Sequence, residues 1–129
     1  MIYLDSSALV TFIARRHHVV ALDGFLSAQA TRTCTSTIGM IETVRTCDRL
    51  GSYPNLMAQL VKDHAEIELT KTVRDAAANL PPAVRSLDAV HIASAEVLGE
   101  ELTALVTYDN RMAEAARGSG LPVVMPGLE

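Results

Sequence analysis

Four acidic residues that lie far apart in the sequence have the chemistry of a cation site. They are Asp5, Glu42, Asp88 and Asp109. Carboxylates gathered within about 4–6 Å would repel by on the order of a few kcal/mol per adjacent pair at an effective dielectric near 20. A divalent cation would remove that repulsion, and all-oxygen ligation suits Mg2+ or Mn2+ better than zinc. One or two such ions can activate a bound water for in-line attack on a phosphodiester, so no nucleophilic side chain would be needed.

Each acid also has a purely structural interpretation. Asp5 and Asp109 could each cap the helix that follows them. Asp88 could be no more than a favourable charge in the first turn of its helix. Glu42 is harder to dismiss, because a charge near a core-facing side of a helix requires a partner. Taken singly, the acids therefore leave both interpretations open.

Hydrophobic patterning indicates the elements that would position these acids. Two short apolar runs, at Ile2–Leu4 and at residues 105–108, each end at an acid and are typical of buried parallel strands. Weaker strand signals lie at residues 32–35, 66–69 and 122–125. Helical spacing covers residues 6–14, 37–50, 56–64 and 73–80, and two further helices are expected, from a Ser86 cap to Gly99 and from Asp109 to Gly118.

Strands that alternate with helices predict an α/β fold, here one domain of residues 1–129. The expected architecture is a three-layer α/β/α arrangement around a central parallel sheet of about five strands. In such a sheet, ligand sites form outside the carboxyl ends of the strands. Asp5 and Asp109 lie at such ends, and Asp88, two residues after Ser86, can point towards the same edge.

The segment of residues 37–50 is predicted to be one helix that carries the odd member of the acidic set. Its apolar spacing comes from Ile38, Ile41 and Val44, and Gly51 is expected to stop it in a left-handed conformation. Glu42 lies at the border of the face that contains Ile38. We therefore expect Glu42 close to the core.

The four acid-bearing blocks together resemble the PIN domain, and more narrowly the VapC toxins of bacterial toxin–antitoxin pairs. The resemblance covers nearly the whole chain and rests on YLDSSALV, IGMIETVR, SLDAVHIASA after a diproline, and VTYDNRMAEAA. It implies a PIN-like α/β/α fold and an endoribonuclease that depends on Mg2+ or Mn2+ and cuts single-stranded or structured RNA. It also implies a homodimer and a cognate antitoxin of the VapB type.

The resemblance assigns roles to individual residues. The family's catalytic, metal-binding acids map onto Asp5, Glu42, Asp88 and Asp109. Its hydroxyl after the first acid maps onto Ser7 in preference to Ser6, and its threonine in the last acid-bearing strand maps onto Thr107. Such hydroxyls can orient carboxylates or bound water. Because every ligand position is filled, an active enzyme is expected.

Basic and histidine residues near these blocks are candidates for contacts to RNA. Arg45 and Arg111 lie beside acid-bearing segments and could bind phosphate. His91 follows Asp88 at i+3 and shares its helix face, where a supporting role is favoured over cation ligation. The run that contains His17 and His18 is typical of a solvated helix end.

The composition is that of an ordinary globular protein, with 129 residues, 49% apolar and 20% charged. The formal net charge of −4 comes from 15 acids and 11 bases, and without the four candidate ligands 11 acids face 11 bases. The net charge therefore speaks against a protein that binds nucleic acid through its overall charge. Affinity for RNA would have to come from local Arg clusters and from bound cations.

Cysteine content and hydropathy indicate a reducing, aqueous compartment. Cys34 and Cys47 form no CxxC pair and are expected to be reduced and packed. The longest stretch without a charged residue, 50–61, is too short and too polar to span a bilayer. The amino terminus resembles no secretory signal, so a cytoplasmic location is expected.

Two other functions fit parts of the pattern. A phosphatase or receiver domain also places an acid after its first strand, but the former wants Asp where Ser7 stands and the latter a late Lys, whereas Lys62 and Lys71 are the only lysines. A PIN-like module that only binds protein, its acids receiving a partner's Arg, remains the alternative. Nuclease activity that is lost in EDTA and restored by Mg2+ or Mn2+ would favour the ribonuclease over this protein-binding module.

Overall fold

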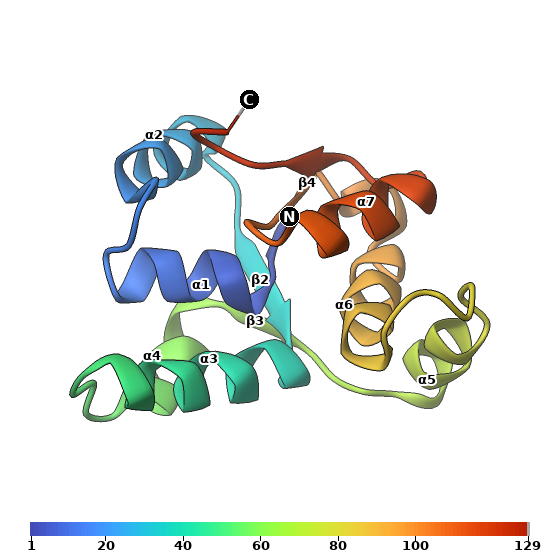
Figure 1. Ribbon diagram of the computed structural model, residues 1–129, viewed down its shortest axis with the longest axis horizontal. Coiled ribbons are helices and arrows are strands. Elements are labelled where there is room, and N and C mark those ends of the chain that lie inside the picture. Colours follow the sequence, from blue (N-terminus) through green and yellow to red (C-terminus); the bar gives the residue numbers. More distant parts are fainter. Residues whose placement is uncertain (129) are drawn as a thin grey trace.

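The computed structural model of the protein describes residues 1–128, in which strands and helices alternate (Figure 1). The strands are β1 (Ile2–Leu4), β2 (Thr33–Ser36), β3 (Ala65–Ile67), β4 (Ala104–Val106) and β5 (Val123–Val124). The helices are α1 (Ser6–Ile13), α2 (Val19–Gln29), α3 (Thr37–Leu50), α4 (Leu56–Asp63), α5 (Lys71–Ala78), α6 (Ser86–Glu96) and α7 (Asn110–Gly118), with a 3-10 turn at Gly99–Glu101.

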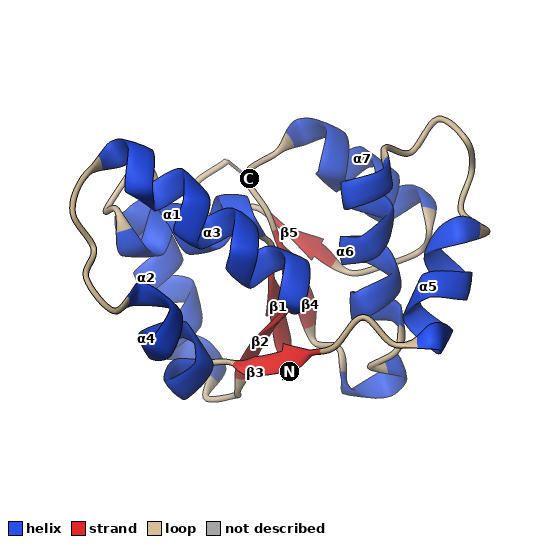
Figure 2. Cartoon of the chain, turned by 90° about the horizontal axis from the view of Figure 1, so that it is seen from below, coloured by secondary structure: helices blue, strands red, loops and turns tan. Residues whose placement is uncertain are grey.

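Within the described range the strands form one five-stranded, all-parallel sheet in the order β3-β2-β1-β4-β5. Figure 2 shows α1 to α4 on one side of this sheet and α5 to α7 on the other. The predicted three-layer arrangement around a central parallel sheet is therefore confirmed. A parallel sheet needs such cover because both of its faces are apolar.

Strand β1 occupies the middle of the sheet and pairs with β2 on one side and β4 on the other. Its register places Leu4 opposite Val106, so the residues that follow, Asp5 and Thr107, emerge next to each other. The chain builds β2 and β3 on one side of β1 before it returns to add β4 on the other side. The carboxyl ends of β1 and β4 are thus the topological switch point, where open α/β sheets bind ligands.

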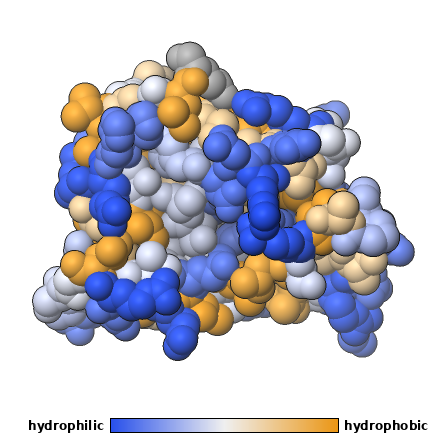
Figure 3. All heavy atoms as spheres, viewed as in Figure 1, coloured by the Kyte–Doolittle hydropathy of each residue, from blue (hydrophilic) through white to orange (hydrophobic). Residues whose placement is uncertain are grey.

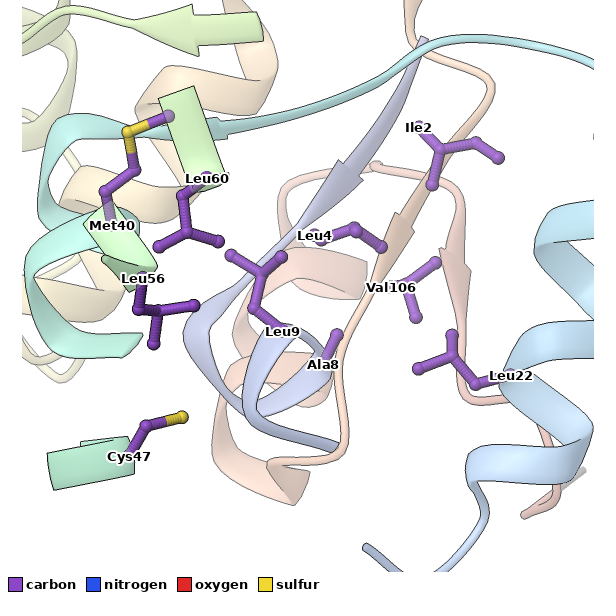
Figure 4. Packing of buried hydrophobic residues seen from close by; sticks show 10 residues of the cluster. All are labelled: Ile2, Leu4, Ala8, Leu9, Leu22, Met40, Cys47, Leu56, Leu60 and Val106. Atoms are coloured by element: carbon purple, nitrogen blue, oxygen red, sulfur yellow. The ribbon is translucent and has the colours of Figure 1, made fainter. Parts of the chain in front are cut away.

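The core consists of two apolar clusters, one on each face of the sheet. Side chains alternate along a strand, so Ile2 and Leu4 face the helices α1 to α4, while Tyr3 faces α6 and α7. Figure 4 shows the first cluster, in which residues of β1 and β4 pack against helix side chains. Both cysteines are buried and free, as expected. Both faces of β1 are thus covered, and Asp5, the residue that follows the strand, lines a pocket at its carboxyl end.

Two expected helix ends are wrong in detail. Helix α6 is capped by Arg85, whose side chain makes no capping hydrogen bond, and Ser86 is the first helical residue instead of the cap. Gly51 does end α3, but its φ of 174° is extended and not left-handed. Its N–H donates to Cys47 O, so the last turn of α3 is closed without a left-handed residue.

Helix α2 carries a pattern from which no helix was predicted. Leu22 is the only fully buried residue of the eleven, and Phe25 and Leu26, three and four residues later, pack partly buried against the same core cluster. His18 caps it in a left-handed conformation, with φ of 74°, and without a side-chain hydrogen bond. The apolar stripe of this helix is therefore short, and its start lacks the side-chain cap that would mark it in the sequence.

Helix α3 has the predicted bounds, but a different face is buried. The buried residues are Gly39, Met40, Thr43 and Cys47, whereas Ile41 is 42% exposed. A Cβ on Gly39 would lie 2.1 Å from Thr35 Oγ1, so the absence of a side chain lets α3 approach β2 closely. With this face of α3 turned to the core, Glu42 is half-buried at the carboxyl edge of the sheet.

On the face shown in Figure 3, hydrophilic and hydrophobic side chains are interspersed. Large exposed apolar side chains include Leu87 on α6 and Leu50 on α3. Among residues 1–128, no helix combines the length and the apolar character needed to cross a membrane.

Candidate active site

A pocket of about 340 Å³ opens at the carboxyl edge of the sheet, and all four predicted acids line it. Asp5 follows β1, Glu42 lies on α3, Asp88 lies in the first turn of α6, and Asp109 caps α7. The other lining residues are Ser6, Ser7, Arg85, Ser86, Leu87 and His91. The acids converge because strand ends and the amino termini of helices meet at this edge.

Asp5 lies at the floor of the pocket and is only 3% exposed. Its Oδ1 accepts hydrogen bonds from Ser7 Oγ at 2.6 Å and from the Ala8 N–H at 2.9 Å, and its Oδ2 accepts one from the Thr107 hydroxyl. Burial raises the pKa of this carboxyl, and His91 together with these hydrogen bonds opposes the rise. Asp5 is therefore a helix cap and a pocket residue at once, so its two interpretations do not exclude each other.

The hydroxyls of Ser7 and Thr107 join the ends of β1 and β4. Ser7 Oγ accepts a hydrogen bond from the Tyr108 N–H at 2.8 Å and lies 3.3 Å from Thr107 Oγ1. Thr107 Oγ1 in turn accepts one from the Asp109 N–H at 3.0 Å. The two hydroxyls thereby hold the carboxylate of Asp5 and the start of α7 in one network. Ser7, which the resemblance preferred to Ser6, is the serine that bonds to Asp5.

Glu42 has the partner that its position required. Its Oε1 lies 2.7 Å from His91 Nε2, and His91 Nδ1 lies 2.7 Å from the Tyr3 hydroxyl. Burial raises the pKa of Tyr3. A carboxylate can only accept, so His91 Nε2 donates to Glu42, and in the neutral ring Nδ1 accepts from the Tyr3 hydroxyl. A buried hydrogen-bond chain from β1 through α6 thus orients Glu42 on α3.

Asp88 and Asp109 share a cation from their own chain, the guanidinium of Arg85. Its Nε lies 3.4 Å from Asp88 Oδ2, and its Nη2 lies 3.8 Å from Asp109 Oδ2. The other oxygen of Asp109 accepts from the N–H groups of Arg111 and Met112 at 2.9 and 3.3 Å, as a helix cap does. Arg85 was not among the site residues predicted from the sequence, although its i,i+3 spacing to Asp88 was a usable signal.

The carboxylates in this pocket are held by partners of this chain and are not drawn around one point. Over residues 1–128, no three His, Cys, Asp or Glu side chains are grouped as the ligands of a common ion. The donor set nevertheless fits a hard divalent cation, because every candidate ligand is a carboxylate oxygen and all four line the same pocket. Arg85 supplies part of the positive charge that such a cluster needs.

The predicted phosphate contacts flank the pocket without lining it. Arg45 is exposed and lines a neighbouring groove of about 370 Å³ that also contains Glu42. Arg111 is exposed and lines a second hollow of about 510 Å³ together with Arg85 and Asp88. Each arginine therefore lies in a hollow next to the acidic pocket.

Fold and pocket together define a parallel α/β domain with an acidic site at its switch point. The PIN domain family model matches residues 2–118. Ribonuclease VapC35 of Mycobacterium tuberculosis is 40% identical over 136 aligned residues, and ribonuclease VapC47 of the same species is 37% identical over 133, each alignment covering 98% of both chains. The chain therefore belongs to the PIN domain family, with VapC ribonucleases among its relatives.

Solved structures support the same fold at lower sequence identity. A toxin–antitoxin complex from Klebsiella pneumoniae contains a chain with a TM-score of 0.75 at 17% identity, covering 98% of each chain. The sarcin–ricin loop cleaving toxin VapC20 of Mycobacterium tuberculosis has a TM-score of 0.70 at 14% identity, over 98% of this chain and all of that one. At such identities the likeness concerns the fold alone.

Proposed function

We propose that this protein is an endoribonuclease that requires Mg2+ or Mn2+ and acts as the toxin of a toxin–antitoxin pair. The observation that carries the proposal is the convergence of Asp5, Glu42, Asp88 and Asp109 in one pocket at the switch point of the sheet. Relatives named as VapC ribonucleases, 35–40% identical over nearly the whole chain, support it.

The four carboxylates would hold the cation, which when bound would supply a water of lowered pKa and neutralise charge on the leaving oxygen. Ser7 and Thr107 fix the Asp5 carboxylate through hydrogen bonds. His91 fixes Glu42 in the same way. Because both acids are held before any ligand arrives, little ordering remains to be done when the cation and the RNA bind.

The purified protein should cleave total RNA in the presence of Mn2+, lose that activity in EDTA, and regain it when Mn2+ is restored. Expression without an antitoxin should also stop bacterial growth. Cleavage that persists in EDTA would rule out the cation requirement. Folded protein that cleaves no RNA with Mn2+ present would rule out the endoribonuclease.

The antitoxin that we propose would be of the VapB type and would place a basic side chain at the acidic pocket. The contacts of Arg85 with Asp88 and Asp109 support this, since they show that the pocket accommodates a guanidinium. Leu87, 50% exposed at the rim, would receive an apolar side chain of the same partner. The homodimer stays a prediction, for which light scattering of the purified protein is the direct measurement.

A further prediction concerns the hydroxyls beside Asp5. Ser7→Ala and Thr107→Ala should each slow RNA cleavage by roughly 10–100-fold, the scale typical of groups that orient a metal ligand. Single-turnover cleavage with saturating Mn2+ measures the effect. Ser94→Ala is a matched control, because that buried hydroxyl donates only within α6, to Val90 O. Full activity in both Ser7→Ala and Thr107→Ala would show that this network does not serve the reaction.

A further inference from the structure

Three aromatic rings form a column beside the acidic pocket. The rings of His17 and His18 are stacked, with centroids 4.1 Å apart and planes 11° from parallel. The rings of His18 and Tyr108 are also stacked, at 5.5 Å and 8°. Among residues 1–128 the column therefore ends at His17, an exposed residue whose second ring face has no stacked aromatic partner.

The inner end of this column is firmly fixed. Burial raises the pKa of Tyr108 to about 12, so its hydroxyl stays protonated, and it donates to Pro126 O at 2.7 Å. The backbone N–H of Tyr108 donates to Ser7 Oγ. Gly127 leaves room for His18, since a Cβ there would lie 2.7 Å from His18 Nδ1. In Figure 1 the C-terminal segment accordingly runs beside α2.

A second pocket, of about 530 Å³, is lined by all three rings of the column. It shares Ser6 and Ser7 with the acidic pocket, so the two pockets are neighbours at the start of α1. Its lining combines hydroxyls, apolar side chains, the three rings and one cation, Arg16. A volume of this size falls in the range of small-ligand sites, about 300–1,000 Å³.

The two arginines of this turn have different surroundings. Arg15 forms an ion pair with Asp23, with Nη2 and Oδ2 2.6 Å apart, and so serves the attachment of α2. Arg16 lines the second pocket instead. A cation next to an open aromatic face is the combination by which proteins hold single-stranded nucleic acid, because every base has a π-face and every nucleotide a phosphate.

We propose that the second pocket is a nucleotide subsite, in which one base of the RNA stacks on His17 while Arg16 binds a neighbouring phosphate. This inference rests on the proposed function. The subsite would give the RNA strand that enters the acidic pocket a second point of attachment. The near-parallel rings favour a flat base over a polypeptide, which would use pockets for individual side chains. The hydroxyls of the lining suit ribose and phosphate oxygens.

The test uses full-length protein and a short single-stranded RNA that spans one cleavage site mapped with the wild type. Binding is measured in an Asp5→Asn background, so that the RNA stays intact. His17→Ala should weaken binding by roughly 5- to 150-fold, the effect of losing one stacked base. His17→Phe keeps an aromatic face and should restore most of the affinity.

Abasic substitution identifies the stacked nucleotide. A series of RNAs is used, each with one abasic nucleotide at a different position. At one position the missing base should weaken binding to the protein that keeps His17 but not to His17→Ala, because the two changes remove the same contact. Arg16→Ala should lower the salt dependence of log K by about 0.7, the value for one phosphate of a single strand. Arg32→Ala removes the same charge at the opposite edge of the sheet, before β2, and should leave that slope unchanged.

The outcomes separate this inference from the proposed function. Unchanged RNA affinity of His17→Ala, with cleavage by the wild type intact, would overturn the subsite alone. A His17→Ala variant that binds RNA normally but loses its antitoxin would assign the pocket to a polypeptide and would also overturn it. If the wild type cleaves no RNA, the proposed function fails. The affinities of the proteins with His17 and with His17→Ala for oligouridylate then test the subsite independently.

Discussion

Replacing Asp5 by Asn should slow RNA cleavage by more than about 100-fold, beyond the range of groups that only orient a ligand. Asp5 is buried at the floor of the pocket and is one of the four carboxylates proposed to hold the cation. The amide can keep the fold, because its oxygen still accepts from the Ala8 N–H and its nitrogen can donate to Thr107 Oγ1. The expected loss therefore reports the missing negative charge and not a collapsed site.

Three measurements are needed for Asp5→Asn: single-turnover cleavage with Mn2+, thermal melting, and growth of bacteria that express the protein. Asp48→Asn is the matched control, since it removes an exposed carboxylate from α3, outside the acidic pocket. It should cleave RNA and arrest growth as the wild type does. Well-folded Asp5→Asn that cleaves at a wild-type rate would mean that Asp5 is only a helix cap.

The sequence could predict the sheet and the placement of two acids because their signals are local. An apolar run that ends at an acid is visible without any tertiary information, and both such runs became strands, β1 before Asp5 and β4 before the loop that carries Asp109. The bounds of α3 were also predictable from its spacing and from Gly51. Its buried face was not, because the close approach of Gly39 to Thr35 depends on how α3 packs against β2.

The supporting partners of the site could not be predicted, since each depends on contacts between distant segments. His91 reaches Glu42 on α3 and Tyr3 on β1, and no spacing within α6 reveals either contact. Arg85 contacts Asp109 only because α6 and α7 begin at the same edge of the sheet. The aromatic column joins His18 to Tyr108 across the fold, which is why a histidine pair resembled a solvated helix end.

Addition of Mn2+ should raise the stability of the wild-type protein by about 2.7 kcal/mol at a hundredfold excess over the Kd, since a ligand of the folded state alone contributes RT ln(1 + [L]/Kd). Asp88→Asn should forfeit most of that gain, because it removes one of the proposed ligands. In EDTA the same variant should differ from wild type by only about 0.3–1 kcal/mol. Small effects oppose each other there: loss of a favourable charge in the first turn of α6 and of the contact with Arg85, against relief of repulsion among the pocket's acids.

Arg85 makes this contrast sharper, because its guanidinium lies between Asp88 and Asp109, where the cation is proposed to bind. Arg85→Gln should therefore increase the Mn2+-dependent gain in melting temperature, whereas Asp88→Asn decreases it. Thermal melts in EDTA and in millimolar Mn2+ measure all three proteins, with Asp48→Asn as a control that keeps the full response. An Asp88→Asn protein that gains as much from Mn2+ as the wild type would remove Asp88 from the cation site. It would leave that residue with its charge in the first turn of α6 and its contact with Arg85.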